Sequence, residues 1–98
     1  MEPEVKRDLK ELLDVPESAL WYEYAAGAAR DIIEEEPEEI LRWLLDECAD
    51  FNANMQEHLA YILCDEPGSF EHEILVRLSK SGNEGVAWRA NEALNYYR

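Results

Sequence analysis

Positive charge is scarce in this sequence. Nine Lys and Arg residues stand against 23 Asp and Glu residues, so the 98-residue chain carries a formal charge of −14. A surface of this sign repels nucleic acid and anionic membranes, because both are negatively charged. It attracts basic proteins and speeds their association. We therefore expect a basic protein partner, with no nucleic acid and no membrane; the alternative is an acidic coat that only keeps the chain in solution.

Long apolar runs are also missing. No stretch approaches the roughly 18 apolar residues of a membrane-spanning helix, and residues 1–13 lack the apolar segment of a signal peptide. Only two cysteines occur, Cys48 and Cys64, and their spacing matches neither a CxxC motif nor a zinc finger. This pattern indicates reduced core cysteines in a cytoplasmic protein, with a disulfide as the less favoured alternative.

Residues that carry chemistry are few. The two histidines, His58 and His72, belong to neither a HExxH nor a Glu-x-x-His motif. The four glycines are dispersed, so no phosphate-binding loop is indicated, and no Ser, Cys or His triad can be inferred. We interpret His58 as a satisfied structural residue and His72 as exposed. The sequence predicts no enzyme, no metal and no cofactor.

What the chain does contain is apolar residues, 47% of the total, at helical spacing. The predicted fold is all-α: about six short antiparallel helices in one domain, residues 1–98, arranged as three stacked helical hairpins. The hairpins are expected at about 4–35, 37–65 and 69–97. Boundary signals come from proline, capping side chains and glycine. Expected helix starts are marked by Pro3, Pro37, Asn52, Ser69 and Asn83. Asp14, with Pro16 and Glu17, predicts a second helix from about residue 17, and Gly82 is expected to end a helix in the left-handed conformation.

One hexapeptide occurs almost twice. Residues 39–44 read EILRWL and residues 73–78 read EILVRL, 34 positions apart. Other apolar positions match at the same step, including Ala26 with Ala60. A fixed period of two helices indicates one hairpin used repeatedly, because each hairpin buries its apolar face on the next.

Residues 86–94, VAWRANEAL, resemble the second helix of a HEAT-type repeat, whose pattern is a valine, an arginine, two small apolar residues and a closing leucine. Residues 55–63, MQEHLAYIL, are a weaker copy. The resemblance implies an α-solenoid fragment whose second helices line a concave face. The repeat here is shorter than the about 40 to 47 residues of that family. Another helical hairpin array, including a tetratricopeptide-like one, and a closed bundle therefore remain open.

The resemblance places acidic and aromatic side chains on the concave face, and these are the candidate partner-binding residues. They are Glu23, Glu57, Tyr61, Trp88 and Glu92. Trp88 among carboxylates is typical of an interface anchor with a charged rim. The alternative, held equally, is that Trp88 folds over the end of the array and, with Tyr96 and Tyr97, covers its terminal core. Three further aromatic residues are expected in the core or at its edge: Trp21, Tyr22 and Trp43.

The densest acidic run contributes three more candidates, Glu34, Glu35 and Glu36. They fall at the expected end of a helix, where negative charge opposes the helix dipole and lowers stability. Carboxylates kept at such a cost indicate a role toward a basic partner, and a solvated turn is the alternative.

Size, charge and scaffold together suggest a function by analogy of class. The first hypothesis is a non-enzymatic immunity protein or inhibitor that neutralises a basic partner such as a bacterial nuclease toxin, whose phosphate-binding site is positive. A second is a HEAT-like scaffold or adaptor that binds a peptide or helix. A third is a nucleic-acid mimic aimed at a DNA-binding protein.

Overall fold

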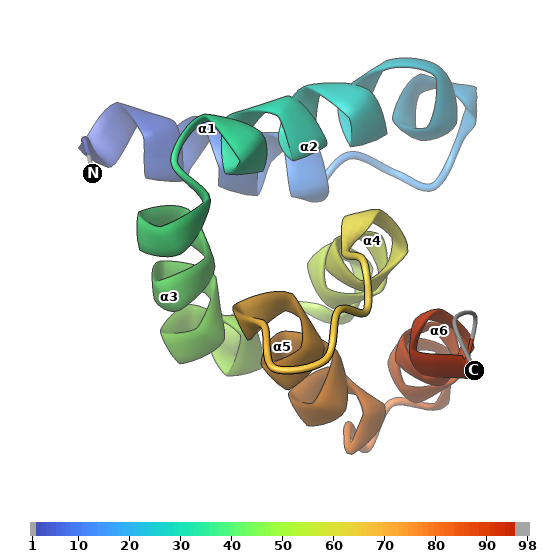
Figure 1. Ribbon diagram of the computed structural model, residues 1–98. Coiled ribbons are helices and arrows are strands. Elements are labelled where there is room, and N and C mark those ends of the chain that lie inside the picture. Colours follow the sequence, from blue (N-terminus) through green and yellow to red (C-terminus); the bar gives the residue numbers. More distant parts are fainter. Residues whose placement is uncertain (1, 96–98) are drawn as a thin grey trace.

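The computed structural model describes residues 2–95, and these residues form an all-α protein without strands (Figure 1). The six α-helices are α1 (Pro3–Leu13), α2 (Ala26–Glu35), α3 (Pro37–Glu47), α4 (Ala53–Ile62), α5 (Phe70–Ser79) and α6 (Glu84–Asn95). A π-helical turn, η1 (Trp21–Ala25), leads directly into α2, and a 3-10 turn, η2 (Cys48–Asp50), follows α3. The predicted fold class is confirmed. The predicted terminal cap of Tyr96 and Tyr97 lies outside the described residues.

Most helix boundaries lie where local chemistry predicts them. Pro3 and Pro37 occupy the start of α1 and α3, where a helix needs no amide hydrogen. Three side-chain caps accept a backbone amide in the first turn of the following helix: Asn52 from Met55, Ser69 from His72 and Asn83 from Val86, at 2.9 to 3.1 Å. These caps were all expected from the sequence.

Two boundary predictions are wrong. Asp14 does not cap a second helix; it closes α1, and Pro16 and Glu17 lie in a turn before helical structure resumes at residue 19. Gly82 does not adopt the left-handed conformation, which is found instead at Gly68 with φ of 81°. Gly68 follows Pro67 in the loop before α5, where the chain reverses and only glycine adopts this conformation without strain.

The helices pack as hairpins around a central α4 (Figure 1). Helix α1 packs on α2, and α5 packs on α6. In the middle hairpin, α3 packs chiefly on α5, while α4 contacts α1, α2 and α6. The Cα radius of gyration is 12.3 Å, close to the about 12.6 Å expected for a compact domain of this length. The second helices α2 and α6 therefore flank α4.

The repeated hexapeptide occupies equivalent places in the core. Ile40, Leu41 and Leu44 of α3 are buried, and so are their counterparts in α5, listed here: Ile74, Leu75 and Leu78. Because α3 and α5 pack on each other, the two copies belong to one apolar interface. The 34-residue step thus marks one helix face used twice, as the sequence predicts.

Polar side chains of α4 and of its N-cap hold the loop between α1 and η1. The amide of Asn52 donates to Asp14 Oδ1 at 2.9 Å, and the amide of Asn54 donates to the Val15 carbonyl at 2.8 Å. His58 Nδ1 donates to the Leu13 carbonyl at 2.8 Å. The bonds from Asn54 and His58 satisfy backbone carbonyls where α1 ends. They position α4 against the first hairpin.

A second set of bonds joins the first hairpin directly to the third. Arg30 of α2 donates to Glu71 of α5, with 2.5 Å between Nη1 and Oε1, and to the Ile62 carbonyl. Glu71 also accepts the backbone amide of Cys64 at 2.9 Å. Burial opposes the charged form of Arg30, but the hydrogen bond and the charge of Glu71 outweigh it and raise the guanidinium pKa. The stack of hairpins is therefore closed by a contact between its two outer members.

Candidate functional site

Exposed large apolar side chains gather on one set of elements. Among residues 2–95 they are Leu20, Tyr22, Tyr24, Tyr61 and Trp88. All five lie in the helical segment that leads into α2, in α4 or in α6. First helices α1, α3 and α5 contribute none of them. Clustered exposed aromatic side chains are typical of surfaces that bind other proteins.

Three of these rings form a continuous surface with one arginine. Tyr22 and Tyr61 meet edge to face, with ring centroids 5.4 Å apart. The Arg89 guanidinium lies 5.5 Å from the ring centroid of Tyr61 and 5.5 Å from that of Trp88. We call Tyr22, Tyr61, Arg89 and Trp88 the aromatic surface. Tyr22, Tyr61 and Trp88 are 45%, 44% and 58% exposed, so their rings are available to a partner.

Glu17 joins two members of the aromatic surface at its edge. Tyr22 Oη donates to Glu17 Oε1 at 2.6 Å, and Arg89 Nη2 lies 3.8 Å from the same oxygen. The hydrogen bond to this carboxylate raises the pKa of Tyr22, because losing the proton would break the bond and place two negative charges together. Tyr22 therefore stays neutral at physiological pH.

A buried stack supports the aromatic surface from behind. Trp21, fully buried, lies parallel to the His58 ring with 3.8 Å between centroids, and its indole meets Tyr61 edge-on at 6.0 Å. His58 was expected to be structural and satisfied. It is buried, with Nδ1 bonded to Leu13, but its Nε2 has no hydrogen-bond partner among residues 2–95. The prediction that His58 is satisfied by hydrogen bonds is therefore wrong for Nε2.

The predicted concave-face residues are only partly brought together. Tyr61, Trp88 and Glu92 lie on or beside the aromatic surface, and Glu92 lines the same groove as Tyr61 and Arg89. Glu57 is half-buried, its carboxylate packed against Gly85 at the start of α6. Glu23 is exposed in η1. The prediction that Trp88 covers the terminal core is not supported by its exposure.

The acidic run lies apart from the aromatic surface. Glu34, Glu35 and Glu36 end α2, whereas Tyr22 precedes that helix. Glu34 pairs with Arg30 at 3.0 Å, and Glu35 and Glu36 line a hollow beside the start of α1. All three are exposed. The eight candidate residues therefore do not form a single site.

Sequence reasoning missed Tyr22, Glu17 and Arg89. Tyr22 was assigned to packing, and Glu17 to a helix cap that does not form. Arg89 was noticed only as the arginine of the HEAT-type pattern. The arginine of that pattern was the one signal that could have pointed to this site, because it follows the exposed Trp88 by one residue.

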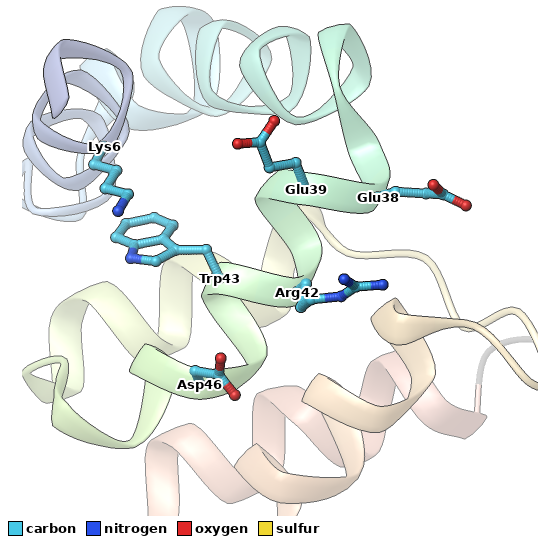
Figure 2. A pocket seen from close by; sticks show the side chains of 6 residues that line it. All are labelled: Lys6, Glu38, Glu39, Arg42, Trp43 and Asp46. Atoms are coloured by element: carbon cyan, nitrogen blue, oxygen red, sulfur yellow. The ribbon is translucent and has the colours of Figure 1, made fainter. Parts of the chain in front are cut away.

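A separate hollow, lined by residues of α1 and α3, differs from the aromatic surface in its lining (Figure 2). It is lined by Lys6 of α1 and by five residues of α3: Glu38, Glu39, Arg42, Trp43 and Asp46. The Trp43 ring is covered by the chain's own ammonium groups, with Lys6 Nζ 5.7 Å and Lys10 Nζ 5.8 Å from its centroid. Because this ring face is already occupied, the hollow offers less to a partner than the aromatic surface.

The remaining histidine and the two cysteines form no metal-binding cluster in the described part of the chain. His72 was expected to be exposed, but it is half-buried and bonded through Nδ1 to the buried Asp65 at 2.5 Å. No group of three or more His, Cys, Asp or Glu residues within 2–95 is placed to hold a metal ion. Cys48 and Cys64 are free thiols, Cys48 in the core as predicted and Cys64 only half-buried.

A search of residues 2–95 for a helix long and apolar enough to cross a bilayer finds none. Comparison of the chain with protein-family models, with curated protein sequences and with solved structures finds no match. The functional argument therefore depends on the geometry described above.

Proposed function

We propose that this chain is a non-enzymatic, cytoplasmic protein-binding module that docks on a basic protein through its aromatic surface. The observation that carries the proposal is the contact of Tyr22, Tyr61, Arg89 and Trp88 across three separate helical segments. Aromatic and arginine side chains dominate binding energy at protein interfaces. The net charge of −14 selects a partner of opposite sign.

The net negative charge of the chain favours inhibition of the basic partner as the specific function. A basic enzyme that binds phosphates, such as a nuclease toxin, would be steered to this acidic chain, as to an immunity protein, and its positive site would be covered. In this proposal the helical hairpins act as a HEAT-like scaffold.

An adaptor that binds a peptide or helix without inhibiting anything is the second candidate. It is favoured by the position of Arg89 in the middle of the aromatic surface, which makes this patch less acidic than the chain as a whole. The two functions differ in their response to salt. Charge-steered association slows as salt rises, whereas docking dominated by apolar contacts changes little.

The experiment is affinity capture with the full chain at low salt, followed by binding measurements with the identified and purified partner. We expect a basic partner whose affinity falls at least about tenfold for Trp88→Ala or Tyr61→Ala, because anchor residues contribute about 2 kcal/mol or more. Tyr24→Ala is the matched control, since Tyr24 is exposed and residues two apart face different sides of a helix. Capture of nothing, or of an acidic protein, would contradict the proposal.

A further inference from the structure

A groove between α4 and α6 borders the aromatic surface. Its floor is formed by the buried Ala60, Ile62 and Leu63 together with the half-buried Ala93. Tyr61, Arg89 and Glu92 also line the groove, which is open to solvent and has a volume of about 480 Å³. The volume is sufficient for a bulky side chain from another molecule.

Small residues keep this groove open. Ala60 and Ala93 come from different helices, and neither side chain extends far enough to fill the space between α4 and α6. The two helices pack on each other elsewhere along their lengths. Such a channel between neighbouring helices accepts the ridge of a third helix.

The acidic excess on the two helices that form the groove favours a basic occupant. Within the described chain α4 and α6 carry four acidic or basic residues besides the buried His58, namely Glu57, Glu84, Arg89 and Glu92. The guanidinium of Arg89 is engaged by two rings and faces Glu17. Glu92 is exposed and lines the groove, so it can pair with a lysine or arginine of the occupant.

We propose that the α4–α6 groove is the anchor pocket for a basic amphipathic helix of the partner. One bulky apolar side chain of that helix enters the groove over Ala60 and Ala93. Further apolar side chains at helical spacing lie on Tyr61 and Trp88, and a basic residue beside the anchor pairs with Glu92. This inference rests on the proposed function and adds the chemistry of the segment that is bound.

The test uses the full chain and a labelled synthetic peptide of about 18 residues, with leucines on one helical face and lysines elsewhere. Fluorescence anisotropy measures its binding. We expect saturable binding, at least about tenfold tighter than for a peptide of the same composition in scrambled order. We also expect no binding of the matching leucine and glutamate peptide. Equal binding of the scrambled peptide would overturn the inference, because charge alone would then explain the affinity.

Filling the groove is the second arm. Ala93→Phe is expected to weaken binding of the leucine and lysine peptide at least about tenfold, a difference of about 1.4 kcal/mol. Ala49→Phe is the matched control, since Ala49 is exposed and away from the groove. Circular dichroism checks that both variants are folded. Unchanged binding by folded Ala93→Phe would overturn the inference.

Charge reversal keeps the test decisive should Ala93→Phe fail to fold. Glu92→Lys and Glu73→Lys change the net charge equally, and both positions are exposed. We expect Glu92→Lys to weaken peptide binding several-fold more than Glu73→Lys; equal losses would overturn the inference. The proposed function stands or falls separately, on whether Trp88→Ala and Tyr61→Ala weaken binding of the natural partner.

Discussion

At the scale of single residues, the two cysteines show how placement changes reactivity. Cys48 is buried in the core at the start of η2, and burial raises the pKa of its thiol. Cys64 follows α4 and lines the groove beside Arg89 and Glu92. The thiolate is the reactive form, so burial protects Cys48 both by exclusion of the reagent and by disfavouring the charge.

We therefore expect iodoacetamide to modify Cys64 before Cys48 in the folded chain. Peptide mass spectrometry over a time course near neutral pH should give rates that differ by at least about tenfold. In denaturant both thiols should react at similar rates, which provides the control. Equal rates in the folded chain would show that Cys48 is accessible.

The bond between Arg30 and Glu71 predicts a loss of stability. Glu71→Gln keeps the shape of the side chain but leaves the partly buried guanidinium with the exposed Glu34 as its remaining charged partner. We expect the free energy of unfolding to fall by about 2 kcal/mol. Urea denaturation measures it. Asp8→Asn removes one member of the well-exposed Arg7 pair, and this control should change stability by less than about 0.5 kcal/mol. Equal effects would contradict the role given to Glu71.

At the scale of the elements, Asn52 has two tasks. Its side chain caps α4 by accepting the Met55 amide, and it donates to Asp14 after α1. Ser69 caps α5 in the same way, but its hydroxyl bonds only within its own loop and helix. One side chain at Asn52 therefore combines local and long-range stabilisation.

Asn52→Ala should cost about 2 kcal/mol, the sum of a lost cap and a lost side-chain bond of about 1 kcal/mol each. Ser69→Ala should cost about 1 kcal/mol. Chemical denaturation of both variants measures the difference. Losses of equal size would mean that the bond to Asp14 adds nothing to stability.

Helices and caps were predictable because their signals are local. Pro37, Asn52 and Ser69 act on the turn that follows them, and the repeated hexapeptide marks its own buried face. The start of the second helix was wrong because Asp14 and Pro16 carry the residue types of a helix start. Bonds to residues about 38 positions later hold this segment as a loop instead.

The candidate site was less predictable, since it depends on how distant segments meet. Helical register correctly left Tyr61 and Trp88 at the surface. Tyr22 and Arg89 could not be assigned from the same register, because their roles arise from contacts with Tyr61 across different helices. Aromatic side chains on an amphipathic helix are ambiguous between core and interface until the neighbours are known.

At the scale of the whole molecule, net charge dominates behaviour in solution. A charge of −14 on a compact domain is self-repulsive, and dissolved salt screens that repulsion. The attractive Arg30 and Glu71 pair is partly shielded from solvent, so salt weakens it less. Screening should therefore stabilise the fold.

We expect the melting temperature to rise by several degrees between about 20 and 500 mM potassium chloride. Circular dichroism at fixed pH gives the measurement. Chloride is used because sulfate stabilises proteins by a separate effect on burial. A fall in melting temperature would show that attractive ion pairs, rather than repulsion, dominate this surface.

The contact between Arg30 and Glu71, which joins the first hairpin to the third, affects the order of folding during synthesis. Arg30 and the Cys64 amide both bond to Glu71, which the ribosome adds after them. While only the first two hairpins have emerged from the exit tunnel, these groups remain hydrated and α4 lacks its neighbour α6. The nascent chain therefore completes its fold only after translation of the third hairpin.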